Sequence, residues 1–102
     1  MGQFIKFVST DELTEGMGKL IEIEEKQIAL FNVGGDFYAL ENACTHRGGP
    51  LAEGKINGEV VTCPWHGAQF NIKTGEVLRP PAPISVTGYN VRIVGTDVEI
   101  EV

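Results

Sequence analysis

The sequence contains two short motifs, Cys44-Thr45-His46 and Cys63-Pro64-Trp65-His66, with sixteen residues between them. Together they hold every cysteine and every histidine of the 102-residue chain. Thiolates suit iron or zinc, and imidazoles suit iron, zinc or copper. The four cysteine and histidine side chains are therefore interpreted as the ligands of one metal site.

The order of the ligands is as informative as their number. Each motif supplies one cysteine and one histidine, whereas a common zinc finger places two cysteines in one motif and two histidines in the other. If the two thiolates hold one iron and the two imidazoles hold a second, with sulfide ions bridging them, each iron is four-coordinate. The mixed order therefore favours a Rieske-type [2Fe–2S] centre.

Three other interpretations remain open at this point. Cys44 and Cys63 can form a disulfide, although thiols inside cells stay reduced and the neighbouring histidines are then unexplained. The four side chains can hold a structural zinc ion, because two cysteines and two histidines are a legitimate tetrahedral set. Finally, the histidines can be ordinary core or surface residues, but both stand at short offsets from the only two cysteines.

The two motifs and their spacing resemble the signature of Rieske ferredoxins, and the resemblance runs along the whole chain. Other stretches that resemble this family are Phe37-Tyr38-Ala39-Leu40-Glu41, His66-Gly67, Phe70 and Pro80-Pro81-Ala82-Pro83. The resemblance implies an all-β chain with the Rieske-type antiparallel β-sandwich. It implies a single domain over residues 1–102, with an inserted cluster-binding subdomain at roughly residues 42–79.

The same resemblance assigns the ligands and the cofactor. It implies one Rieske-type [2Fe–2S] cluster per chain, bound by Cys44, His46, Cys63 and His66. The two cysteines are expected to hold the buried iron, and the two histidines the iron near the surface. Electrons are then expected to enter and leave through the imidazole edge.

The chain departs from one branch of this family at four positions. Rieske subunits of respiratory and photosynthetic cytochrome complexes carry an extra cysteine in each motif, and these cysteines form a disulfide; here the places hold Gly49 and Trp65. That branch also has a serine and a tyrosine whose hydroxyls bond to cluster sulfurs, where this chain has Ala68 and Phe70. Neither Ala68 nor Phe70 can donate such a bond. Because hydrogen bonds to sulfur raise the reduction potential, we predict a reduction potential near the low end of the Rieske range, about −150 to +300 mV.

Several residues beside the ligands have both a functional and a purely structural interpretation. Gly48, Gly49 and Gly67 are expected either to bring backbone amides close to sulfur atoms or simply to form turns. Pro80-Pro81-Ala82-Pro83 is either a stiff third loop that closes over the cluster or a connector. Trp65 either covers the cluster and contacts a partner or packs locally.

The charged candidates are Arg47 and three glutamates. Arg47 follows His46, where a positive charge favours the reduced cluster and can pair with a partner's carboxylate; the alternative is a solvated surface arginine. Glu22, Glu24 and Glu25 form an acidic cluster. It is interpreted as a solvated hairpin, with steering of a basic reductase as the alternative.

Hydrophobic residues alternate with a period of two between frequent turn residues, which predicts an all-β domain. Turns are expected at Glu25-Lys26, Gly34-Gly35, Asn57-Gly58, Thr74-Gly75 and Gly95-Thr96-Asp97, and a capped helical turn at Ser9-Thr10-Asp11-Glu12-Leu13. Strands are expected at residues 4–8, 19–24, 28–33, 37–40, 60–61, 70–72, 77–78, 91–93 and 98–102.

Composition excludes several classes of function. The net charge is −6 and the pI is about 4.8, and the sequence lacks the basic stripe that nucleic-acid binding needs. The N-terminal residues lack the basic and apolar regions of a signal peptide, and no stretch approaches transmembrane length. We therefore expect a cytoplasmic monomer with no nucleic-acid or membrane partner.

An oxygenase subunit also needs a mononuclear iron held by two histidines and a carboxylate. The chain has only two histidines, and the proposed cluster uses both. We therefore predict a soluble, low-potential ferredoxin and not an enzyme: an electron-transfer component that carries single electrons from a flavin-dependent reductase to a terminal oxygenase of the ring-hydroxylating dioxygenase type. The alternative is a small Rieske subunit of a larger oxidoreductase, such as a nitrite reductase-like complex.

Overall fold

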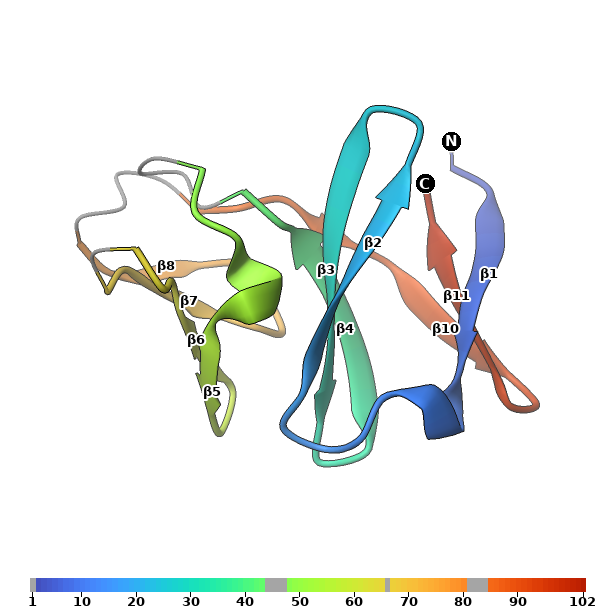
Figure 1. Cartoon of the computed structure of the whole chain (residues 1–102). Helices are drawn as coiled ribbons and strands as arrows, with labels where there is room; N and C mark the ends of the chain where they lie inside the picture. The colour runs from blue at the N-terminus through green and yellow to red at the C-terminus, as the bar shows by residue number, and fades with distance from the viewer. Residues whose placement is uncertain (1, 44–47, 66, 81–84) are drawn as a thin grey trace.

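The computed structural model describes residues 2–43, 48–65, 67–80 and 85–102. Within these residues the chain forms three antiparallel sheets (Figure 1). The terminal sheet has the order β1 (Phe4–Ser9), β11 (Asp97–Glu101), β10 (Val91–Val94), and the central sheet has the order β2 (Gly18–Ile23), β3 (Lys26–Val33), β4 (Asp36–Glu41), β9 (Gly88–Tyr89). The small sheet has the order β5 (Lys55–Asn57), β6 (Val60–Thr62), β7 (Gln69–Asn71), β8 (Val77–Arg79). The predicted all-β antiparallel fold is confirmed.

Two single turns of 3₁₀ helix are described, η1 (Thr10–Glu12) and η2 (Leu51–Glu53). The predicted helical turn after β1 is confirmed by η1, where the backbone N–H of Ser9 donates to the Glu12 carboxylate at 2.5 Å. The η2 turn was not predicted. It leads from the first motif into the small sheet and packs against β2 and β3.

Strand β3 is buried on both faces. Ile28 and Leu30 contribute to a core between the terminal and central sheets, and Ala29 and Phe31 contribute to a core shared with η2 and the small sheet. All four residues are 0% exposed. Adjacent residues of a strand point to opposite faces, so the uninterrupted apolar run at residues 28–31 is explained by two cores that meet at one strand.

The turn between β3 and β4 is fixed by glycines and by a buried amide. Gly34 and Gly35 have φ angles of +62° and +94°, a region that favours glycine. The side chain of Asn32 accepts a hydrogen bond from the Gly35 N–H at 2.9 Å and donates to the Leu13 carbonyl at 2.7 Å. The predicted Gly34-Gly35 hairpin is confirmed. The preceding turn lies at Glu24-Glu25, one residue earlier than predicted.

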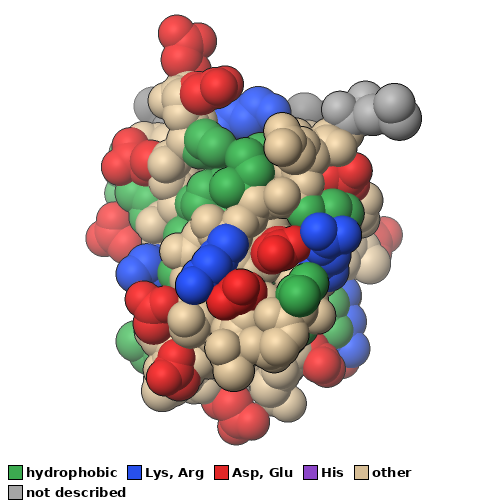
Figure 2. Space-filling view, turned by 90° about the vertical axis from the view of Figure 1, so that its right-hand side faces the viewer, with side chains coloured by type: hydrophobic (Ala, Val, Ile, Leu, Met, Phe, Trp, Pro, Cys, Tyr) green, Lys and Arg blue, Asp and Glu red, His purple; other side chains and the backbone are tan. Residues whose placement is uncertain are grey.

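The outer face of the terminal sheet is covered by paired charges. Lys6 lies 3.1 Å from Asp97, and the Arg92 guanidinium donates to Glu99 at 2.6 Å. Figure 2 shows acidic and basic side chains interleaved on this side of the molecule. The small sheet lies on the opposite side, away from both termini (Figure 1). In the described part of the chain, no helix has the length and apolar character needed to cross a membrane.

We predict that Phe31→Ala lowers the free energy of unfolding by about 3–5 kcal/mol, because it opens a cavity between the central and small sheets. Leu20→Ala is the matched control on the neighbouring strand, since Leu20 is 41% exposed; its cost should stay below about 1 kcal/mol. Urea denaturation followed by circular dichroism measures both. Equal losses for the two variants would contradict the described core.

Candidate metal centre

Of the four proposed ligands, Cys63 lies within the described residues. Cys44, His46 and His66 lie outside them, as do Arg47 and residues 81–84, which include most of the predicted proline loop. The structure does describe the residues on either side of these ligands.

The residues on either side of the first motif are joined to each other. Ala43 and Pro50 form an antiparallel bridge, and the Leu51 N–H donates to the Asn42 carbonyl at 2.8 Å. The side chain of Asn42, only 4% exposed, accepts the Ala52 N–H at 2.8 Å. Asn42 thus joins the chain before the first motif to η2 after it. Gly48 and Gly49 are the described residues between the two sides of this closure, and we call them the first ligand loop.

The second motif lies in the turn between β6 and β7. The two strands pair in the register Val61↔Phe70 and Thr62↔Gln69. The Cys63 N–H continues the ladder by donating to the Ala68 carbonyl at 2.7 Å. Pro64, Trp65 and Gly67 lie in the turn that follows, and we call them the second ligand loop.

The two ligand loops meet at Gly49. A β-carbon placed on Gly49 would lie 2.5 Å from the Sγ of Cys63 and 3.2 Å from the Cγ and Cδ2 atoms of Trp65. Real β-carbons do not approach other atoms as closely as 2.5 Å. Glycine is therefore required at this position, and it lets the first loop lie directly against the second at the thiol of Cys63.

The surroundings of Cys63 fit a metal-bound thiolate. Cys63 is 2% exposed. It packs in one core cluster with apolar residues of η2 and the small sheet, namely Leu51, Val61, Ala68, Phe70 and Ile72. A thiolate in such surroundings needs a compensating positive charge, which a bound iron supplies. The predicted buried cysteine side of the site is consistent with this environment.

Ala68 and Phe70 lie in the same core cluster as Cys63, and both are 0% exposed. Neither side chain has a hydroxyl group, so neither can donate a hydrogen bond to a cluster sulfur. These two side chains beside Cys63 therefore lack the hydrogen-bond donors whose absence is the reason for predicting a low reduction potential.

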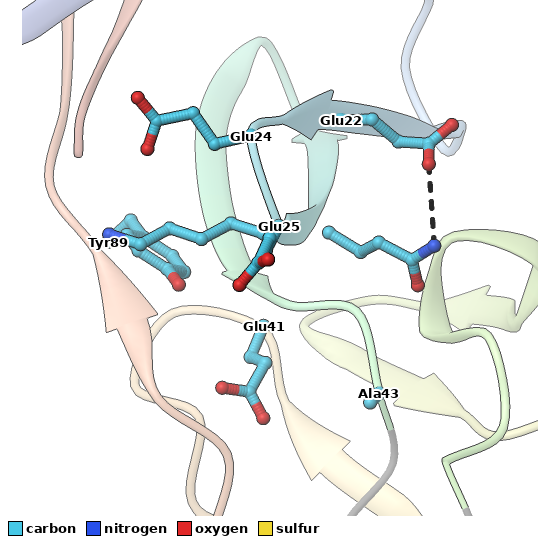
Figure 3. Close-up of a pocket in the computed structure, with 8 residues that line it drawn as sticks. Glu22, Glu24, Glu25, Glu41, Ala43 and Tyr89 are labelled. Atoms are coloured by element: carbon cyan, nitrogen blue, oxygen red, sulfur yellow. Dashed lines mark hydrogen bonds between the residues drawn. The ribbon is translucent and has the colours of Figure 1, made fainter.

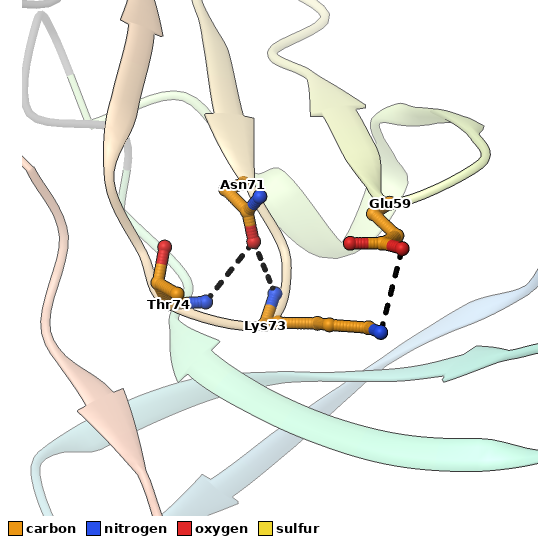
Figure 4. A network of polar contacts seen from close by, with 4 residues as sticks. All are labelled: Glu59, Asn71, Lys73 and Thr74. Atoms are coloured by element: carbon orange, nitrogen blue, oxygen red, sulfur yellow. Dashed lines mark hydrogen bonds and ion pairs between the residues drawn. The ribbon is translucent and has the colours of Figure 1, made fainter.

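A network of polar contacts lies at the end of β7 (Figure 4). Asn71 Oδ1 accepts the backbone N–H groups of Lys73 and Thr74 at 2.8 and 3.2 Å, and Lys73 Nζ lies 3.4 Å from the Glu59 carboxylate. The contact with Glu59 raises the pKa of Lys73. Lys73 Nζ also lies 5.8 Å from the ring centre of Tyr38 on β4, so it links the small sheet to the central sheet.

The acidic cluster predicted at the β2–β3 turn lines a pocket of about 400 Å³ (Figure 3). The pocket also contains Glu41, Tyr89 and Ala43, so it lies beside the base of the first ligand loop. Burial, and then the charge of Glu41, raise the pKa of Tyr89. Glu41 was missed from the sequence because strand pairing brings it to the β2–β3 turn: it pairs with Ile28.

Comparison with known proteins identifies the family. The model of the Rieske [2Fe-2S] domain matches residues 3–90. The biphenyl dioxygenase ferredoxin subunit of Pseudomonas sp. (strain KKS102) is 36% identical over 99 residues, which cover 96% of this chain and 91% of that protein. The 3-phenylpropionate/cinnamic acid dioxygenase ferredoxin subunit of Shigella boydii serotype 4 (strain Sb227) is 44% identical over 75 residues, covering 72% and 71% of the two chains.

A chain of a solved structure has the same fold as this chain over most of the length of both. A chain in the complex of reduced oxygenase and oxidized ferredoxin in carbazole 1,9a-dioxygenase superposes with a TM-score of 0.92 at 28% sequence identity. The match covers 96% of this chain and 92% of that chain. The Rieske-type fold predicted from the sequence is confirmed.

We predict that Asn42→Ala lowers the free energy of unfolding by about 1–3 kcal/mol, because it removes the acceptor of the Ala52 N–H. Gln27→Ala is the control, since its exposed amide makes only a 3.4 Å contact with Glu22; it should cost less than about 0.5 kcal/mol. Urea denaturation measures both. Wild-type stability in Asn42→Ala would show that this amide does not hold the first ligand loop closed.

A measurement of the reduction potential tests whether the lack of hydroxyl donors at Ala68 and Phe70 keeps that potential low. We expect a midpoint below about +100 mV by voltammetry, within the Rieske range of about −150 to +300 mV. Phe70→Tyr should raise the potential by adding a donor beside the cysteine sulfur, whereas Phe37→Tyr, at a residue packed against the other core, should leave it unchanged. A wild-type midpoint above about +100 mV, or no rise in Phe70→Tyr, would contradict this explanation.

Proposed function

Because the chain belongs to the Rieske [2Fe–2S] domain family, we propose that it is a low-potential ferredoxin that passes single electrons from a flavin-dependent reductase to a terminal oxygenase. The oxygenase is of the ring-hydroxylating dioxygenase type. Support comes from relatives that are ferredoxin components of dioxygenase systems, one of them aligned over 96% of this chain. The family carries a [2Fe–2S] cluster, which accepts and returns one electron.

We assign the four ligands as the sequence predicts. Cys44 and Cys63 hold one iron, and His46 and His66 hold the other. The observation that carries this assignment is the contact at Gly49, where the first ligand loop meets Cys63 Sγ. Cys63 is buried in the core shared by the central and small sheets, which excludes water from its sulfur.

The number of histidines in the chain favours an electron carrier over an enzyme. The two histidines of the chain are both assigned to the cluster, which leaves none for a mononuclear iron site. The protein therefore passes electrons on to a partner that activates oxygen. We further propose a cytoplasmic monomer of one domain, residues 1–102, in which residues 42–79 form the cluster-binding subdomain.

Two measurements test this function. Titration of the oxidised protein with dithionite should take up one electron per chain. In stopped-flow mixing, the reduced protein should then be oxidised by the terminal oxygenase of the biphenyl dioxygenase system, and the flavin reductase of that system should reduce it again. Uptake of no electrons, or of two, would contradict the proposal, as would failure of the loaded protein to exchange electrons with both components.

The alternative, a small Rieske subunit of a larger oxidoreductase, differs in its assembly. A subunit of that kind stays bound to its large partner during purification in high salt. A carrier that shuttles between two components is released. Isolation of the chain alone from its native cell extract at high salt supports the ferredoxin, and co-purification with a large redox protein supports the subunit.

A further inference from the structure

We infer that Trp65 is a positioning residue that clamps the two ligand loops together by packing its indole ring on the backbone of Gly49. The inference rests on the proposed ligand assignment, because it concerns how the two loops are held around one cluster. It assigns to a non-covalent contact the task that a disulfide performs in the cytochrome-complex branch, whose two extra cysteines occupy the places of Gly49 and Trp65.

The indole ring of Trp65 lies directly against Gly49. The Cγ and Cδ2 atoms of the indole lie 3.2 Å from the point where a β-carbon of residue 49 would stand. Gly49 is buried, whereas Trp65 is 48% exposed. The indole therefore lies at the surface of the second ligand loop and covers the backbone of the first. A side chain at position 49 would displace both the ring and the thiol of Cys63.

The loops need such a contact because of their composition. The backbone bonds of Asn42 and Cys63 that the structure describes lie at the base of each loop. Beyond those bases, Gly48 and Gly67 have φ angles of +73° and +77°, and glycine gives a chain more conformational freedom than any other residue. A broad aromatic surface restricts that freedom without a covalent bond.

Trp65 is also well suited to contact a partner protein, because about half of it is exposed. The two roles give different results. A residue that only contacts a partner changes the rate of electron transfer between proteins and leaves the cluster of the isolated protein unaltered. A clamp changes the isolated protein itself: the lifetime of its cluster and the uniformity of the iron environment.

The test compares Trp65→Ala and Trp65→Phe with the wild type and with Ile93→Ala. Ile93 is the matched control, since it is 46% exposed and lies on β10 of the terminal sheet. The first measurement is the rate of cluster loss in the isolated protein with an iron chelator, followed by visible absorbance. The second is the line width of the electron paramagnetic resonance spectrum after reduction. Circular dichroism reports whether each variant keeps its sheets.

We expect Trp65→Ala to lose its cluster about tenfold faster than the wild type, a ratio that corresponds to ~1.4 kcal/mol, and to show broader resonance lines. Trp65→Phe keeps a flat ring and should stay within about threefold, or ~0.7 kcal/mol. Ile93→Ala should match the wild type.

Wild-type cluster lifetime and line width in Trp65→Ala would overturn the clamp, even if transfer to the oxygenase slowed. Equal acceleration in Trp65→Ala and Ile93→Ala would overturn it as well, because it would indicate general loosening. If the wild type itself holds no iron–sulfur cluster, the proposed function fails, and that result is distinguishable from failure of the clamp alone.

Discussion

The close approach of Gly49 to the thiol of Cys63 is the constraint on which the site depends. Two motifs separated by sixteen residues serve one cluster only if their loops lie against each other. Any side chain at position 49 would keep them apart, since its first carbon would already lie 2.5 Å from the sulfur. The hydrogen bonds of Asn42 and Cys63 fix the base of each loop, and the small sheet supports both.

Strand β3 connects this site to the rest of the molecule. One of its faces completes the core between the terminal and central sheets, and the other, through Ala29 and Phe31, completes the core that surrounds Cys63. Cys63 therefore shares a core with the same strand that stabilises the sandwich. The charged outer face of the terminal sheet lies on the opposite side of the molecule from the small sheet (Figure 1).

Strong local signals were readable in the sequence, and contacts between distant segments were not. The Gly34-Gly35 hairpin and the capped turn at Ser9 were predicted because their residues act within one turn. Strands β5 and β9 were missed, since they have three and two residues and are defined by their pairing partners. The role of Asn42 was missed too: asparagine side chains commonly bond to backbone groups nearby in the sequence, but the partner of Asn42, Ala52, lies ten residues later. The ligand assignment rests on chemistry and spacing, and three of its four residues lie outside the described part.

The central claim is that two imidazoles and two thiolates share one two-iron cluster, with both imidazoles on the same iron. The most direct measurement is electron–nuclear double resonance on the dithionite-reduced protein, prepared with ¹⁵N-labelled histidine. We predict couplings to two histidine nitrogens and an average g value clearly below that of all-cysteine clusters. A spectrum without histidine coupling, or a protein that contains zinc and no acid-labile sulfide, would contradict it.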